Sequence, residues 1–149
     1  MGMTWLLVFA AMAVAVASVL VARWCLLVVR VVGLSMLPAL RHQERVLALR
    51  SPYGRPVRHG DLVVYHLPAR AFGHSAADVA DTALPLVVKR AVALGGDPAP
   101  GGGTVPPRHI FVVGDNPESN DSRHYGPVPL TCVVGRVVAR LGQLAESAA

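Results

Sequence analysis

The chain has 149 residues, which is enough for one domain and little else. Hydrophobic residues make up 53% of it, only 5% are aromatic, and the formal net charge is +5. Because no basic run is interleaved with aromatic residues, the charge favours contact with anionic lipid headgroups, and we expect no nucleic-acid partner. Cys25 and Cys132 lack the spacing of a metal or redox motif, so we expect no metal and no cofactor, while a disulfide between them stays open.

The first predicted element is one transmembrane helix, in an N-terminal anchor formed by residues 1–25. Residues 4–22 carry no charge, and as a helix they would be about 28 Å long, close to the roughly 30 Å hydrocarbon core of a bilayer. Trp5 and Trp24 stand near its ends, where indole rings favour the membrane–water interface. A cleaved signal peptide is the alternative, but the segment lacks a basic start and exceeds the usual apolar length of about 7 to 15 residues.

A mainly β, antiparallel domain is predicted over residues 26–141, followed by a short flexible tail at 142–149. Its β-branched and apolar residues occur in short runs punctuated by glycine and proline, which is typical of strands. We expect strands at residues 26–32, 45–49, 61–67, 86–94, 109–113 and 133–138. Loops are expected at residues 51–59, 68–85, 95–107 and 114–126.

Ser35 is the candidate nucleophile. It lies in the apolar run VVGLSMLPAL at residues 31–40, with Gly33 two positions before it and Pro38 three positions after it. Those two residues bend the backbone away from regular strand pairing, which presents the hydroxyl. The alternative is a turn serine that only bonds its own backbone.

Lys89 is the candidate general base. It is the only lysine, and the other 13 basic residues are arginines. A lysine amine can lose its proton when it is desolvated, whereas a guanidinium stays charged. Strand alternation places Lys89 on one face with Val87, Ala91 and Ala93, where burial would lower its pKa. The alternative is a surface lysine left by chance in an arginine-rich chain.

Together with the polar loop GDNPESNDSRHYG at residues 114–126, these two residues make the chain resemble the signal peptidase I family of membrane-bound serine proteases. The matching motifs, in the family's order, are SMLPAL at 35–40, GDLVVY at 60–65, VKRAVALGGD at 88–97 and VPPRHIFVVGDNPESNDSRHYGPVP at 105–129. The resemblance implies a serine endopeptidase that cuts signal or leader peptides from exported preproteins after a small-x-small pattern.

The resemblance also assigns roles to individual residues. Ser35 would attack the scissile carbonyl and supply a backbone N–H to the oxyanion, Lys89 would act as the base, and Ser119 would orient the lysine. Structural support of the site would come from Gly114, Asp115, Asn116, Ser122 and the ion pair of Asp121 with Arg123. The substrate pockets would be lined by Met36, Leu40, Val87 and Val88, for which core packing is the alternative role.

The chain departs from the family pattern at three places. Gly33 stands where some members have an oxyanion-hole serine, and Ala39 replaces a common threonine. The loop between Asn116 and Ser119 is one residue shorter than the commonest family pattern. A serine–histidine enzyme is an alternative, but the family's base position holds lysine.

The membrane topology receives two opposite predictions. The arginines that follow the helix favour a cytoplasmic domain by the positive-inside rule. The resemblance implies a single-pass protein of the cytoplasmic membrane with its catalytic domain on the extracytoplasmic face, in contact with lipid. Alternatives from the same residues are a maturation protease dedicated to one precursor, a catalytically silent membrane-anchored binding domain, and a self-cleaving regulator.

Overall fold

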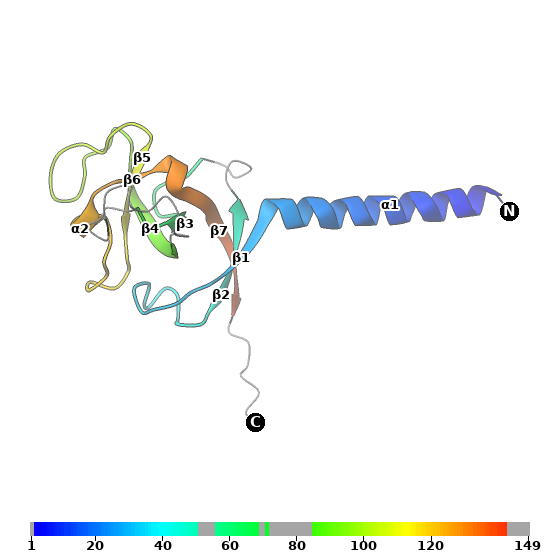
Figure 1. Cartoon of the computed structure of the whole chain (residues 1–149), viewed down its shortest axis with the longest axis horizontal. Coiled ribbons are helices and arrows are strands. Elements are labelled where there is room, and N and C mark those ends of the chain that lie inside the picture. The colour runs from blue at the N-terminus through cyan, green and yellow to red at the C-terminus, as the bar shows by residue number, and fades with distance from the viewer. Residues whose placement is uncertain (1, 51–55, 69–70, 72–84, 143–149) are drawn as a thin grey trace, which may run out of the picture.

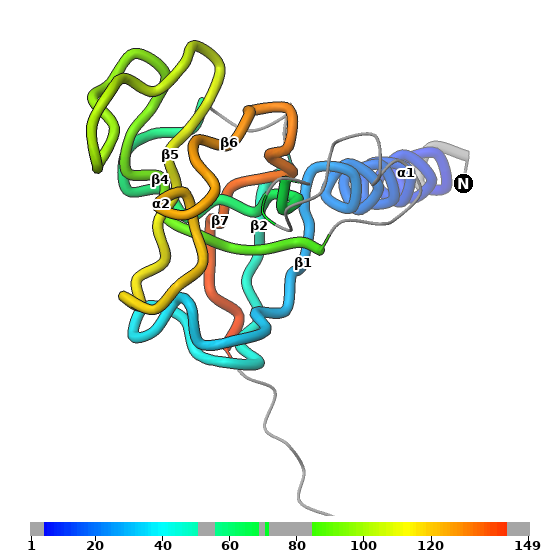
Figure 2. The backbone as a smooth tube through the Cα atoms, turned by 60° about the vertical axis from the view of Figure 1, so that its left-hand side comes forward, coloured from blue at the N-terminus to red at the C-terminus, as the bar shows by residue number. Residues whose placement is uncertain are grey.

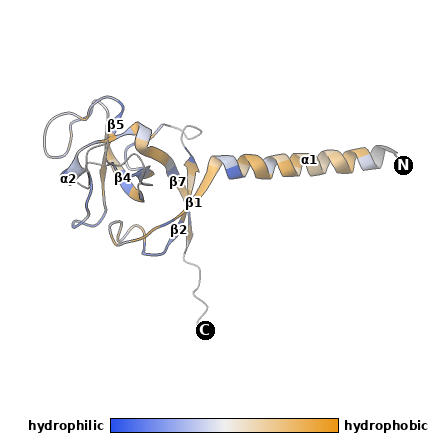
Figure 3. Ribbon diagram, in the orientation of Figure 1, coloured by the Kyte–Doolittle hydropathy of each residue, from blue (hydrophilic) through white to orange (hydrophobic). Residues whose placement is uncertain are grey.

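One long N-terminal helix projects from a β-domain in the computed structural model, which describes residues 2–50, 56–68, 71 and 85–142 (Figure 1). The helix, α1, spans Gly2–Cys25. Its segment Trp5–Cys25 has a mean hydropathy of 2.6, and none of it is buried against the rest of the chain. Figure 3 shows hydrophobic residues along nearly all of α1. The predicted helix is therefore present, and it is long and apolar enough to cross a membrane.

The β-domain is built on an antiparallel sheet, as predicted. Within the described residues the sheet has seven strands in the order β1-β2-β7-β3-β4-β5-β6. The strands are β1 (Leu26–Arg30), β2 (Arg45–Arg50), β3 (Leu62–His66), β4 (Leu86–Leu94), β5 (His109–Val113), β6 (Val128–Pro129) and β7 (Val133–Gly142). Register shifts interrupt the β2–β7, β3–β7 and β4–β5 ladders, and such irregularities bend a sheet (Figure 2).

The last strand, β7, joins the two halves of the sheet. It lies between β2, which follows the Ser35 segment, and β3, which pairs with the Lys89 strand. Gly135 makes this close packing possible, because a Cβ atom there would lie 2.6 Å from the carbonyl oxygen of Leu49. One continuous sheet therefore carries Lys89 on β4 and supports, between β1 and β2, the segment that holds Ser35.

Apolar side chains from β3 enter two buried clusters. Val64 packs with Val46 of β2 and Val88 of β4, while Val63 and Tyr65 pack in the second cluster with side chains of β4 and β5. Alternation along a strand sends successive side chains to opposite faces, so β3 is covered on both. Each fully buried valine contributes roughly 1.5 kcal/mol or more to stability.

The structure corrects several predicted boundaries. The first strand ends at Arg30 rather than residue 32, and β7 continues past residue 138 to Gly142. The predicted loop at 114–126 contains a one-turn helix, α2 (Ser122–Tyr125), because the side chain of Asp121 caps it by accepting from the backbone N–H of Arg123. A short 3-10 helix, η3 (Leu130–Cys132), precedes β7. Cys25 and Cys132 are both free thiols.

Other sequence-based predictions lie outside the described residues. Residues 51–55, 69–70, 72–84 and 143–149 belong to the predicted loops and the predicted tail. The predictions for them are neither confirmed nor corrected.

Candidate active site

Lys89 lies in the middle of β4, opposite Val63 of β3, and only 3% of its surface is exposed. Its Nζ donates a hydrogen bond to Oγ of Ser119, with 2.5 Å between the two atoms. Desolvation lowers the pKa of this amine from 10.5 to about 8, against the opposing effect of the nearby Asp121 carboxylate. Lys89 can therefore exist as a neutral amine at mildly alkaline pH, which is the form a general base requires.

Asp121 fixes the loop that carries Ser119. Its carboxylate is fully buried and accepts hydrogen bonds from the backbone N–H of Gly114 and from the backbone and guanidinium of Arg123. Burial alone would raise the pKa of Asp121, but these hydrogen bonds outweigh it and hold the pKa below its ordinary value. The sequence-based pairing of Asp121 with Arg123 is thus present as an ion pair with an N–O distance of 2.7 Å.

Ser122 attaches the same loop to the sheet. Its Oγ accepts a hydrogen bond from the backbone N–H of Val112 at 3.0 Å, and both residues are buried. The loop is consequently held at the end of β5 rather than left in solvent.

Ser35 sits in a turn between β1 and β2 and is partly exposed. Gly33 opens the turn with a φ of +104°, a conformation that favours glycine, and the backbone N–H of Leu37 donates to the carbonyl of Leu34. Asn116 bonds this turn twice: its backbone N–H donates to the carbonyl of Ser35 at 3.1 Å, and its Nδ2 donates to the carbonyl of Leu34 at 3.2 Å.

Gly114 shows how closely the candidate residues converge. A Cβ atom at this position would lie 2.6 Å from the carbonyl oxygen of Ser35 and closer still to the side chain of Ser119. The backbone of Gly114 is therefore in contact with both, and Ser119 in turn holds Nζ of Lys89. Segments 54 residues apart along the chain are brought to one place, Ser35 from the turn and Lys89 from β4.

Asp115 and Arg90 form a second ion pair beside the site. Two guanidinium nitrogens of Arg90 bond the two carboxylate oxygens of Asp115 at 2.8 and 2.7 Å. A third nitrogen of Arg90 donates to the carbonyl of Gly60 at 2.9 Å. This pair connects three of the sequence motifs, and the role of Arg90 was missed by sequence reasoning although it directly follows Lys89.

The predicted pocket residues are mostly core residues in this structure. Met36, Leu40 and Val88 are buried in one apolar cluster, and Val87 is half-buried at the edge of the other. Their contact with substrate stays a prediction.

A tyrosine pair near the site was also missed. The hydroxyls of Tyr65 on β3 and Tyr125 on α2 lie 2.5 Å apart. Burial raises the pKa of Tyr65, so it remains a neutral phenol. Two tyrosines 60 positions apart give no signal in the sequence, since only the fold brings them together.

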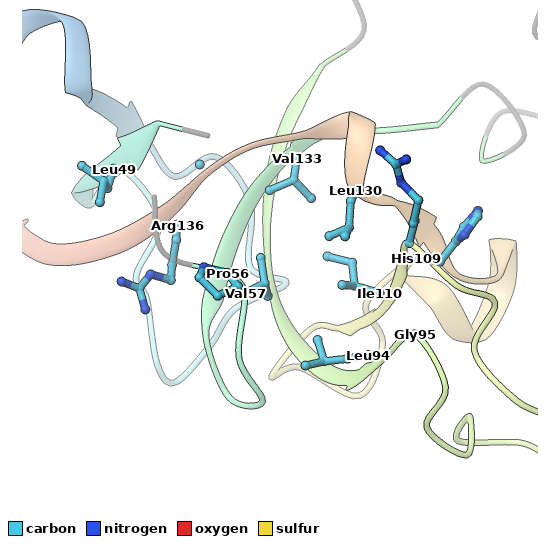
Figure 4. Close-up of a pocket in the computed structure, with 12 residues that line it drawn as sticks. Leu49, Pro56, Val57, Leu94, Gly95, His109, Ile110, Leu130, Val133 and Arg136 are labelled. Carbon is cyan, nitrogen blue, oxygen red and sulfur yellow. The ribbon is translucent and has the colours of Figure 1, made fainter. Parts of the chain in front are cut away.

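A cavity of about 390 Å³ lies elsewhere in the domain (Figure 4). It is lined by Leu49, Pro56, Val57, Leu94, Gly95, Arg108, His109, Ile110, Leu130, Val133, Gly135 and Arg136. None of the predicted site residues is among them. In the part of the chain that the structure describes, no group of three or more His, Cys, Asp or Glu side chains could hold a metal ion.

Comparison with known proteins identifies the class. The chain matches the family described as signal peptidase, peptidase S26, over residues 3–100 and 98–141, segments that include Ser35, Lys89 and Ser119. The chain therefore belongs to the S26 signal peptidase family, as its motifs predicted.

A relative supports the same conclusion. The chain is 32% identical over 120 residues to mitochondrial inner membrane protease subunit 1 of Schizosaccharomyces pombe (strain 972 / ATCC 24843), a match that covers 73% of this chain and 69% of the relative. Membership places the chain among membrane-bound proteases that remove signal peptides from precursor proteins, and its apolar helix supports a single-pass membrane protein.

Proposed function

We propose that this protein is a serine endopeptidase that removes signal or leader peptides from exported preproteins with Ser35 and Lys89 as its catalytic dyad. One observation carries the proposal. A buried amine with its pKa lowered to about 8 is held by Ser119, at the place where the Ser35 turn meets the loop of residues 114–126. A buried lysine whose pKa is lowered by desolvation has the properties of a general base.

The proposed reaction uses the neutral amine twice. Lys89 accepts the proton of the Ser35 hydroxyl while Oγ attacks the scissile carbonyl carbon, and the backbone N–H of Ser35 donates to the developing oxyanion. The lysine ammonium then gives its proton to the leaving amine as the acyl-enzyme forms. A water molecule, deprotonated by Lys89, attacks the ester and releases the signal peptide, and the proton returns to Ser35.

The proposed specificity is for small residues at the first and third positions before the cut. Met36 and Leu40 come from the turn that carries Ser35, and Val87 and Val88 directly precede Lys89. Because most of these side chains fill the core, little depth is left for a substrate side chain, which suits small residues. The preprotein would bind as an extended strand beside them.

The proposed arrangement is an anchor at residues 1–25, a catalytic domain at 26–141 and a tail at 142–149. β1 begins at Leu26, directly after α1 ends at Cys25, so no linker separates the domain from the membrane surface. The positive charge of the chain suits contact with anionic lipid headgroups there. We propose the cytoplasmic membrane as the location, with the domain on the extracytoplasmic face, since domains translocate largely regardless of charge.

Cleavage of a secretory precursor in detergent tests the proposal. Wild-type protein, Ser35→Ala and Lys89→Ala are incubated with the precursor, and the new N-terminus of the product is sequenced. We expect only the wild type to cut, after a small-x-small pattern. Cleavage by either variant would refute the dyad, and binding of precursors without cleavage by the wild type would favour a silent binding domain.

A further inference from the structure

We propose that Asn116 is a positioning residue that sets the separation between the nucleophile and the base. The inference rests on the proposed Ser35–Lys89 dyad and assigns a role that the dyad itself does not require. Its basis is four hydrogen bonds of Asn116, two toward the Ser35 turn and two within the loop that carries Ser119.

Toward the nucleophile, Asn116 holds two consecutive carbonyl groups. Its backbone N–H donates to Ser35 and its Nδ2 donates to Leu34, so the peptide groups on both sides of the nucleophile's Cα are engaged by one residue. The peptide between Leu34 and Ser35 also contains the N–H that would bind the oxyanion. Fixing it therefore fixes both the direction of the Cα–Cβ bond of Ser35 and the oxyanion donor.

Toward the base, Asn116 organises the loop that carries Ser119. Its side-chain Oδ1 accepts from the backbone N–H of Glu118 at 3.0 Å, and its carbonyl accepts from the backbone N–H of Ser119 at 3.0 Å. Ser119 then accepts from Nζ of Lys89. A short path of hydrogen bonds thus runs from the Ser35 backbone through Asn116 and Ser119 to the lysine amine.

The chemistry of asparagine fits this position. The site needs one donor and one acceptor on a short side chain, because Nδ2 faces the carbonyl of Leu34 while Oδ1 faces the N–H of Glu118. Aspartate would keep the acceptor but place a carboxylate oxygen against the Leu34 carbonyl. Alanine would keep neither. The opposite side of the turn has its own contact, from the N–H of Gly33 to Nδ1 of His42 at 3.0 Å. Loss of the Asn116 side chain would leave the side that faces the base with only the backbone bond to Ser35.

Two substitutions test the proposal with full-length protein in detergent. Asn116→Ala removes both side-chain bonds, and Asn116→Asp keeps the loop turn while it removes only the bond to Leu34. Asn120→Ala and Asn120→Asp are matched controls, because Asn120 is exposed on the same loop. For each variant, kcat and KM for precursor cleavage are measured from pH 6 to 10, together with the melting temperature.

We expect both Asn116 variants to lose about 10- to 100-fold in plateau kcat, since small displacements of reacting groups cost this much. KM should be unchanged, and kcat should still rise with pH to an alkaline plateau. The pH midpoint of Asn116→Ala should stay near 8, because Lys89 remains buried. The inference is overturned if plateau kcat equals that of the Asn120 controls. It is also overturned if the midpoint of Asn116→Ala moves toward 10.5, because exposure of Lys89 would indicate general collapse of the loop. Activity in Ser35→Ala, by contrast, would refute the dyad itself.

Discussion

Replacing Lys89 by methionine is expected to stabilise the protein at neutral pH while it abolishes cleavage. Near pH 7 the wild-type amine is mostly protonated although it is buried, and the shift of its pKa from 10.5 to about 8 corresponds to a cost of about 3 kcal/mol. Methionine has a similar length and carries no charge. Loss of the hydrogen bond to Ser119 destabilises the variant by about 1 kcal/mol, so the net rise in the free energy of unfolding should be about 2 kcal/mol.

The stability advantage of Lys89→Met over the wild type should fall as the pH rises. The unfolded lysine keeps its proton up to about pH 10.5, whereas the folded one releases it near pH 8. Between these values the unfolded state binds more protons, so the stability of the wild type rises with pH. The advantage of Lys89→Met is therefore full below pH 8 and falls steeply by pH 10.

Thermal unfolding followed by circular dichroism of the β-domain measures this effect. In detergent at pH 7 the melting temperature of Lys89→Met should exceed that of the wild type by roughly 5 °C or more, and at pH 10 the two should nearly coincide. Arg140→Met, which removes an exposed cation, serves as the control and should show no such pH-dependent gain. A lower melting temperature for Lys89→Met at both pH values would refute the claim that a buried charge is unfavourable there.

Two further predictions concern activity. The rate of wild-type cleavage should increase about tenfold from pH 7 to a plateau above pH 9. The reason is that the neutral fraction of an amine with a pKa of about 8 rises over this range from about one tenth to nearly all. A rate that falls over this range in folded protein would contradict the lysine base. Gly114→Ala should abolish cleavage, since its methyl group would lie 2.6 Å from the carbonyl oxygen of Ser35 and overlap the side chain of Ser119. Asn120→Ala, a substitution at an exposed position of the same loop, should cleave normally. Equal activity of Gly114→Ala and Asn120→Ala would show that the contact at Gly114 is unimportant.

Local patterns predicted most of the elements. β4 and β5 have the predicted bounds because their apolar runs are closed by glycine, proline or polar residues at both ends. The pairing of β7 between β2 and β3 was not predictable, since it joins segments more than 60 residues apart and leaves no local signal. β7 also runs past its apolar pattern to Gly142, because the ladder with β2 continues while Ala139 and Arg140 stay exposed.

In the candidate site too, local sequence patterns predicted some features, while others depend on contacts between distant segments. Burial of Lys89 was expected from Val87 and Ala91, its neighbours on the strand. The assignment of Ser119 came from family resemblance, and the structure places its hydroxyl on the amine although the loop is shorter than usual. The resemblance predicted a supporting role for Asn116, but its individual hydrogen bonds were not foreseeable, because they depend on the path of a loop that has no periodic pattern.

The most direct test of the Ser35–Lys89 dyad is the rate of precursor cleavage by Lys89→Arg across pH 6 to 10. Arginine keeps the positive charge of the lysine but stays protonated throughout this range, so it cannot accept the serine proton. We expect cleavage to fall to the background level of Ser35→Ala at every pH, in protein whose melting curve is still cooperative. Cleavage that remained within about tenfold of the wild type would contradict a lysine base and with it the proposed mechanism.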